Sequence, residues 1–130
     1  MIGIVIVAHG GLAGEYVKAI EHVVGPQHGL RGITIESDCN RGTKQDEICH
    51  AANDAEEGDG VVIVTDMLGG SPSNLSLKAC QPENRRILYG ANLPMLIKLA
   101  KSRNMDVAAA ASAAMDAGRK YINSHVVSAD

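Results

Sequence analysis

A histidine, an aspartate and a serine follow two apolar, strand-like runs of the chain. His9 ends the run GIVIVAH, Asp66 follows VVIVT, and Ser71 stands a few residues later in DMLGGSPSN. A neutral imidazole keeps a lone pair on one ring nitrogen. It can attack a phosphoryl group when a carboxylate holds the proton on the other nitrogen. We predict that His9 is the nucleophile, that Asp66 orients it, and that the Ser71 hydroxyl meets the incoming phosphoryl oxygens.

Glycine-rich loops lie next to these side chains. Ser71-Pro72 predicts a helix start, with serine as the N-cap and proline at the first helical position. A glycine loop that opens a helix aims backbone N–H groups at an anion. The predicted phosphoryl-binding residues are Gly10, Gly11, Gly69, Gly70 and Asn92. Each loop alone is ordinary turn and capping chemistry, but their clustering around one histidine favours a phosphate-sized anion.

Other interpretations of these residues fit less well. A dinucleotide fingerprint would place His9 where the tight-turn glycine belongs, so the imidazole would project into the pyrophosphate channel. A Ser-His-Asp hydrolase lacks its G-x-S-x-G elbow, and Pro72 has no N–H for an oxyanion hole. The structural alternative for His9 is an end-of-strand histidine that is satisfied by a backbone carbonyl.

Composition excludes several further classes of function. The 130 residues are 45% hydrophobic and 21% charged, which fits a single globular domain, 1–130. A net charge of −3, three tyrosines and no Phe or Trp argue against nucleic-acid binding. No metal and no cofactor are expected, because ligand spacing is absent among His22, His28, His50, His125, Cys39, Cys49 and Cys80.

The chain carries no signal for membrane insertion or export. Its apolar runs are too short to span a bilayer, and Met1 leads into a strand without a basic leader segment. The cysteines form no C-x-x-C pair and are expected to be reduced thiols. We therefore predict a cytoplasmic protein without direct membrane insertion.

Strand and helix patterns alternate along the sequence. Apolar, β-branched runs predict strands at 1–8, 29–37, 60–65 and 85–90. Helical periodicity predicts helices at 12–24, 43–57, 72–81, 94–103 and 106–117. Gly118 is the predicted stop of the last helix, and KYINSHVV (120–127) is a candidate for one more short strand.

This alternation predicts an α/β domain with a mostly parallel sheet, right-handed crossovers and helices on both faces. Ligands of such sheets lie outside the carboxyl ends of the strands, where His9 and Asp66 stand. If the first and third strands are neighbours, about 4.8 Å separates their backbones and the two side chains can meet.

The stretches IVIVAHGGLAGE, TDMLGGSPSN and GANLPML resemble a bacterial family over essentially the whole chain. This family is the enzyme IIA component of the mannose-type phosphoenolpyruvate:sugar phosphotransferase system. The resemblance implies that His9 is the phosphorylated histidine, accepting phosphoryl from phospho-HPr and passing it to a histidine of a IIB component. It implies that Asp66 orients the imidazole and that Ser71 lies beside the phosphoryl site.

The resemblance also implies a three-layer fold and a homodimer. The family sheet has four parallel strands in the order 2-1-3-4. A fifth, antiparallel edge strand near the C-terminus is exchanged between subunits, which would give 120–127 a partner and cover an exposed edge.

Two departures from the family pattern stand out. Ser73 occupies a position where family members commonly carry phenylalanine, so apolar area for a partner is lost. The chain ends at Asp130 without a linker or IIB domain, so we expect a separate IIB protein. The alternative is a regulatory protein without a transport role, whose partner responds to the charge that phosphorylation adds at His9.

Overall fold

Four apolar runs of the chain form a parallel β-sheet in the computed structural model. The strands are β1 (Gly3–His9), β2 (Leu30–Ile35), β3 (Val61–Thr65) and β4 (Arg85–Leu88). The structure describes residues 1–67, 69–81 and 84–128. Leu68 of the predicted glycine loop and the last two positions of the predicted domain 1–130 lie outside the described residues.

The strand order is β2-β1-β3-β4, as predicted. β1 therefore lies between β2 and β3, with His9 opposite Ile35 in the first pairing and Val7 opposite Thr65 in the second. All three pairings are parallel, so the carboxyl ends of the strands share one edge of the sheet. That edge carries both His9 and the residue after β3, Asp66.

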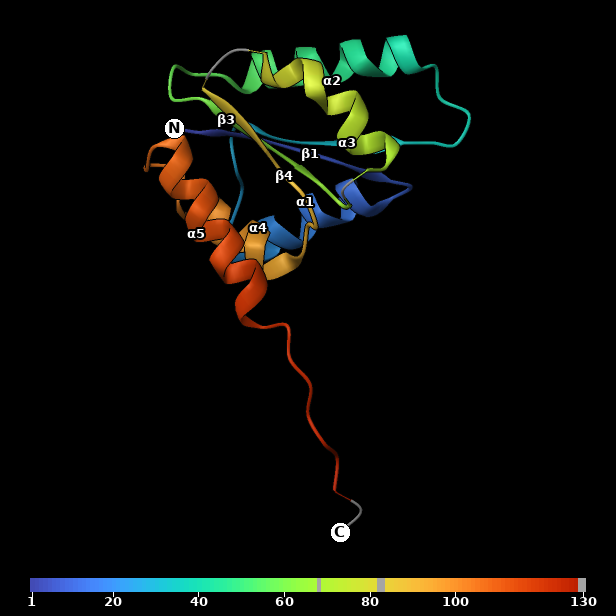
Figure 1. Ribbon diagram of the computed structural model, residues 1–130. Helices are drawn as coiled ribbons and strands as arrows, with labels where there is room; N and C mark the ends of the chain where they lie inside the picture. The colour runs from blue at the N-terminus through green and yellow to red at the C-terminus, as the bar shows by residue number, and fades with distance from the viewer. Residues whose placement is uncertain (68, 82–83, 129–130) are drawn as a thin grey trace.

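Helices cover both faces of this sheet and make three layers (Figure 1). Their bounds are α1 Leu12–Val24, α2 Arg41–Ala55, α3 Ser71–Ser76, α4 Leu93–Lys101 and α5 Val107–Lys120, with a 3-10 turn η1 at Leu77–Cys80. Helices α2 and α3 lie on one face, and α1, α4 and α5 on the other (Figure 1). The predicted helix 72–81 is thus an α-helical turn that tightens into 3-10 geometry.

Alternate residues of the central strands supply the two cores. On β1, Ile4 and Ile6 face the layer of α1, α4 and α5, while Val5 and Val7 face the layer of α2. This pleated alternation explains why the run is continuously apolar, because both faces are buried. It also directs His9, two residues beyond Val7, to the α2 and α3 side.

Gly118 does not end the last helix, so this prediction is wrong. Helix α5 continues to Lys120, and Gly118 lies buried inside it. A Cβ at Gly118 would lie 3.1 Å from Cβ of Met95. The absence of a side chain lets α5 approach α4 closely, so Gly118 serves helix packing rather than termination.

The candidate strand 120–127 is also not formed. Lys120 belongs to α5, and residues 122–128 carry no regular secondary structure. They extend away from the body of the protein (Figure 1). A strand needs a neighbour to satisfy its backbone N–H and C=O groups, and this segment has no β-partner within the described part of the chain.

Candidate functional site

His9 stands at the centre of the carboxyl edge of the sheet. It is the last residue of β1, and its side chain is 48% exposed although the rest of the strand is buried. Gly10 turns the chain directly behind it with φ +54°, a left-handed conformation that favours glycine. The strand thus ends in a turn that leaves one side of the imidazole accessible.

Asp66 holds the imidazole from the neighbouring strand. Its Oδ2 accepts hydrogen bonds from the His9 backbone N–H at 2.9 Å and from the ring Nδ1 at 2.8 Å. An ionised carboxylate can only accept hydrogen bonds, so Nδ1 carries the proton and Nε2 of the neutral ring keeps its lone pair. The predicted contact between His9 and Asp66 is present.

The Asp66 carboxylate is kept ionised by the same contact. Burial of the carboxyl raises its pKa, but the hydrogen bonds from the backbone and ring of His9 outweigh this effect. The net result is a pKa below the usual value for aspartate. An ionised Asp66 also stabilises positive charge on the ring, which favours attack by Nε2 on an electrophile.

The loop after Asp66 differs from its predicted capping arrangement. The N-cap of α3 is Gly70 rather than Ser71, and its cap has no side-chain hydrogen bond. The hydroxyl of Ser73 organises the loop instead, accepting from the Gly69 N–H at 3.1 Å and donating to the Gly70 carbonyl at 3.0 Å. Ser71 is therefore not needed as a cap, and it lines an open pocket together with His9.

Replacement of Ser73 by alanine tests this account of the loop. We expect Ser73→Ala to lower the free energy of unfolding by about 1 kcal/mol, because the buried hydroxyl makes two hydrogen bonds. Urea denaturation measures this loss. Ser112→Ala, at an exposed position of α5, is the matched control and should not lower the free energy of unfolding. Equal stability of the two variants would contradict a structural role for Ser73.

The predicted glycine donors fall into two groups. The N–H of Gly10 donates to the Ile35 carbonyl at 3.2 Å, and that of Gly69 donates to Ser73. Among the described residues, the N–H groups of Gly11 and Gly70 have no acceptor and remain available. A Cβ on Gly70 would lie 3.3 Å from Cε1 of His9, so a side chain there would crowd the ring.

Asn92 lies apart from the His9 pocket. Its Oδ1 caps α4 by accepting from the Met95 N–H, and its Nδ2 donates to the Gly118 carbonyl, both at 3.0 Å. It lines a different pocket, between β4, α4 and α5. Asn92 therefore connects two helices and is not part of the proposed phosphoryl site.

The β2–α2 connection supplies the second wall of the His9 pocket, which sequence reasoning missed. The wall contains Glu36, Ser37, Cys39 and Arg41. Because β2 is the other neighbour of β1, its carboxyl end lies beside His9, whereas the loop after β4 lies farther along the edge. The strand order implied by the family resemblance was the signal that could have identified this wall.

Two negative observations concern the part of the chain that the structure describes. No group of three or more His, Cys, Asp or Glu side chains within it could hold a metal ion. None of its helices is both long and apolar enough to cross a bilayer.

The fold and the paired His9 and Asp66 define a class of α/β protein with a histidine at the carboxyl edge of its sheet. A family model for the fructose IIA component of the phosphotransferase system matches residues 3–116. The chain belongs to this family of phosphotransferase components.

Relatives and solved structures agree with this assignment. The mannose-specific EIIAB component of Escherichia coli strain K12 is 28% identical over 106 residues, covering 81% of this chain. This chain spans about a third of that relative, since the match covers 33% of its length. The phosphotransferase component EIIA from Streptococcus agalactiae is 25% identical, with a TM-score of 0.85 over 95% of this chain and 97% of its own.

A further solved structure supports the fold alone. The mannose/sorbose-specific IIA subunit from Enterococcus faecalis is 20% identical, with a TM-score of 0.85. The superposition covers 98% of this chain and 96% of that one.

Proposed function

We propose that His9 accepts a phosphoryl group from phospho-HPr and passes it to a IIB component. The observation that carries this proposal is the 2.8 Å contact between Nδ1 of His9 and Oδ2 of Asp66. It assigns the proton to one ring nitrogen and leaves the other free, on a half-exposed side chain. Family membership supports the choice of donor and acceptor. We expect the reaction to take place in the cytoplasm.

The transfer balances without any additional reactant. The Nε2 lone pair of His9 forms a bond to phosphorus while the bond between phosphorus and the donor's histidine nitrogen breaks. The electron pair of the broken bond returns to the donor nitrogen. The proton on Nδ1 stays hydrogen-bonded to Asp66 throughout. In the transfer to IIB, an acceptor atom of IIB forms the new bond to phosphorus, and the electron pair of the bond between phosphorus and Nε2 returns to His9.

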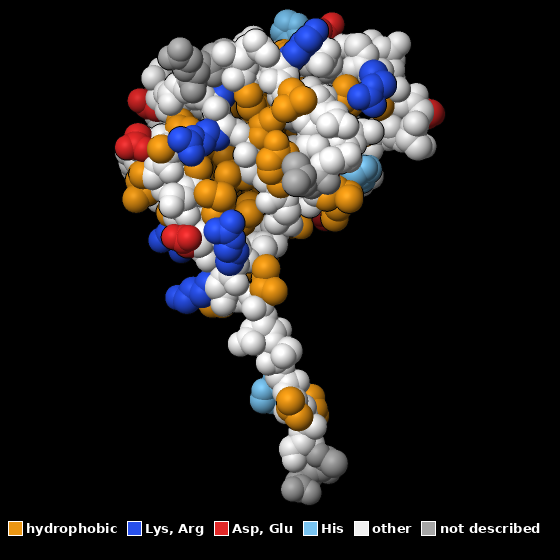
Figure 2. Space-filling model, viewed as in Figure 1, with side chains coloured by type: hydrophobic (Ala, Val, Ile, Leu, Met, Phe, Trp, Pro, Cys, Tyr) orange, Lys and Arg blue, Asp and Glu red, His pale blue; other side chains and the backbone are white. Residues whose placement is uncertain are grey.

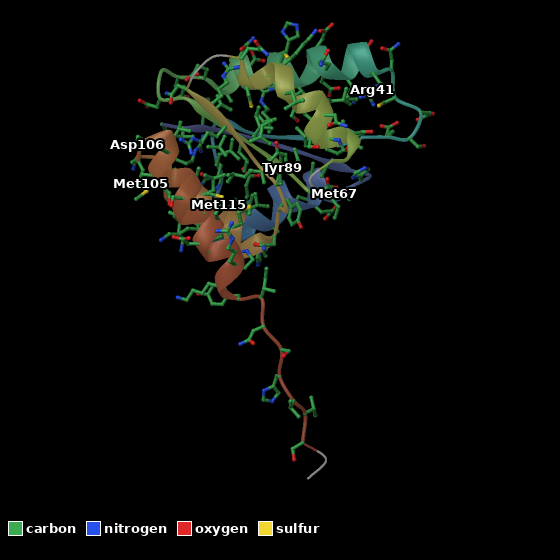
Figure 3. All side chains as sticks on the ribbon, viewed as in Figure 1. Arg41, Met67, Tyr89, Met105, Asp106 and Met115 are labelled. Atoms are coloured by element: carbon green, nitrogen blue, oxygen red, sulfur yellow. The ribbon has the colours of Figure 1, made fainter. Side chains whose placement is uncertain are left out.

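Backbone groups and one hydroxyl would hold the transferred oxygens. The N–H groups of Gly11 and Gly70, which have no acceptor among the described residues, lie in the loops on either side of His9. Ser71 lines the same pocket as His9. Phosphoryl transfer depends mainly on positioning and on stabilisation of charge, so these donors can act without a general acid. The 54% exposed Met67 lies beside Gly70 and provides apolar surface for a partner next to the imidazole (Figure 3).

The direct test uses the purified protein with phosphoenolpyruvate, enzyme I and HPr. We expect labelled phosphate to appear on the chain and peptide mapping to place it on His9. Omission of HPr is the control and should prevent labelling. Phosphate on another residue, or no labelling of the wild-type protein, would overturn the proposal. Addition of a IIB protein should then remove the label from His9.

We also propose that the chain forms a homodimer through its C-terminal segment. The outer edge of β4 has no partner strand in the described chain. A pocket beside it is lined by Ile87, Tyr89, Met115 and Ile122. Hydrophobic side chains lie both on this face and along the protruding segment (Figure 2). If the C-terminal segment paired as a strand with β4 of a second subunit, it would cover the exposed edge of that sheet, and its own hydrophobic side chains would become buried.

The mass in solution tests the dimer. Ile122, Val126 and Val127 are 75%, 90% and 84% exposed in the single chain, which is unfavourable unless another chain covers them. We expect a dimer mass by light scattering for the wild-type protein and a monomer mass for the double variant Val126→Asp, Val127→Asp. Met105→Asp, at the other end of α5, is the control and should remain dimeric. A wild-type monomer at all concentrations would refute the dimer.

A further inference from the structure

Arg41 stands across the pocket from His9. It is the first residue of α2, and its side chain lines the same pocket as His9 and Ser71. The pairing of His9 with Ile35 brings the β2–α2 connection next to the imidazole. Figure 3 shows Arg41 at the end of α2 nearest the carboxyl edge of the sheet. Among the described residues that line the pocket, Arg41 therefore places a cationic side chain on the wall opposite the glycine loop.

The position of Arg41 in its helix is electrostatically unfavourable. The N-terminus of a helix carries a partial positive charge, so acidic residues are favoured in the first turn and basic ones are disfavoured. The first turn of α2 contains Arg41 and Lys44 and no acidic residue. A residue that breaks a local rule without structural compensation indicates a functional requirement. A bound anion would interact favourably with both the positive end of the helix dipole and the guanidinium of Arg41.

Arg41 has no charged partner among the described residues that would keep it away from such an anion. Arg31 and Arg85 form ion pairs with Asp54 and Glu56. Within the described residues Arg41 forms no ion pair. Lys44, the other cation of the turn, donates to Glu47 at 2.8 Å, and this hydrogen bond raises the pKa of Lys44. Of the two cations in the first turn of α2, Arg41 is therefore the one without an ion pair to a described residue.

Charge balance in the pocket requires a cation once a phosphoryl group arrives. A phosphorylated side chain carries close to two negative charges at neutral pH. The walls already hold Glu36, and Asp66 lies directly behind the imidazole. Of the described side chains that line the pocket, Arg41 is the one with a fixed positive charge. Its planar fork of N–H donors suits two phosphoryl oxygens at once.

We propose that the Arg41 guanidinium binds the phosphoryl oxygens while the group is on Nε2 of His9. This inference rests on the proposed phosphorylation of His9 and adds a residue that holds the phosphoryl group. Arg41 offsets the repulsion from Glu36 and Asp66 and stabilises the phosphorylated state. Because this contact exists only when an anion is present, we do not expect it to stabilise the free protein.

The test compares Arg41→Gln, Arg41→Lys and a matched control, Arg31→Gln. Arg31 lies on β2, in a different pocket. The first measurement is a titration with inorganic phosphate, in which the amide NMR shifts of residues around His9 report phosphate binding. Loss of one charge-assisted contact at an exposed site should weaken phosphate binding by about three- to tenfold in Arg41→Gln. Arg41→Lys should restore part of the loss, and Arg31→Gln should bind phosphate as the wild type does.

The second measurement is the pH titration of the phosphorus NMR signal of the phosphorylated protein. A nearby cation favours the dianion, so Arg41→Gln should move the midpoint of the phosphoryl titration to higher pH. The melting temperature of Arg41→Gln should stay the same or rise, because the substitution removes a positive charge from the N-terminus of α2. A purely structural role for Arg41 would instead lower the melting temperature and leave the phosphoryl midpoint unmoved.

The outcomes separate this inference from the proposed function. A wild-type protein that is labelled on His9, with phosphate binding and phosphoryl midpoint unchanged in Arg41→Gln, overturns the role of Arg41 and leaves the phosphocarrier intact. A wild-type protein that is never labelled, but binds phosphate more tightly than Arg41→Gln, supports the anion contact and overturns the phosphocarrier. Equal phosphate binding by all four proteins overturns the inference.

Discussion

Asparagine in place of His9 is expected to abolish phosphate incorporation from phosphoenolpyruvate, enzyme I and HPr. The side chain of asparagine is a neutral amide without a nucleophilic lone pair on nitrogen, so no bond to phosphorus can form. The loss should be complete within detection, because the described pocket contains no second histidine. Incorporation is measured as acid-labile, base-stable label on the intact chain.

A surface histidine provides the control for this experiment. His28 is 82% exposed and pairs with Glu57 at the opposite end of β2. His28→Asn should accept phosphate at the wild-type rate. The His9→Asn variant should also keep its circular dichroism spectrum, because the side chain is half-exposed and outside the two cores. Residual labelling of His9→Asn would show that another residue accepts the phosphoryl group.

Replacement of Asp66 by asparagine should slow phosphoryl transfer by about ten- to a thousandfold. The asparagine amide can present its N–H to Nδ1, which would move the ring proton to Nε2 and block the attacking nitrogen. The charge that stabilises a positive ring is also lost. The rate is measured by rapid quench with phospho-HPr in excess, so that transfer rather than encounter is observed.

The same variant should have a characteristic pH dependence of stability. The folded-state pKa of Asp66 lies below its ordinary value of about 3.9, so its charged form stabilises the folded protein above that pH. This stabilisation is lost as the pH falls from about 3.9 through the lowered folded-state pKa. The free energy of unfolding of the wild type relative to Asp66→Asn should therefore decrease in acid. Asp54→Asn, at a 61% exposed surface position, is the control for both measurements.

The prediction of the elements succeeded where a local signal was strong. The apolar runs that became β1 and β3 are buried on both faces, which is why they contain no polar residue until the sheet ends. The last helix was misjudged because glycine is a usual helix stop. At Gly118 a close contact with Met95 decides the outcome, and such a contact between distant residues leaves no local pattern.

The contact between His9 and Asp66 could be predicted for the same reason. His9 and Asp66 were identified because each directly follows an apolar run. Ser73 was judged only by the apolar area it lacks, although its hydroxyl holds the glycine loop. The position of Arg41 in the His9 pocket could not be predicted from local sequence, because it depends on which strand lies beside β1. Asn92 looked equivalent to the other loop residues until the strand order placed it elsewhere.

The sequence by itself determined the residue types that can do the chemistry and the alternation of strands and helices that carries them. These follow from local properties: the burial of an apolar run, the flexibility of glycine and the titration of imidazole. Only the tertiary structure decided which loops face His9, because parallel strands pair with neighbours that are not adjacent in sequence. The order β2-β1-β3-β4 places Asp66 on one side of the histidine and Arg41 on the other.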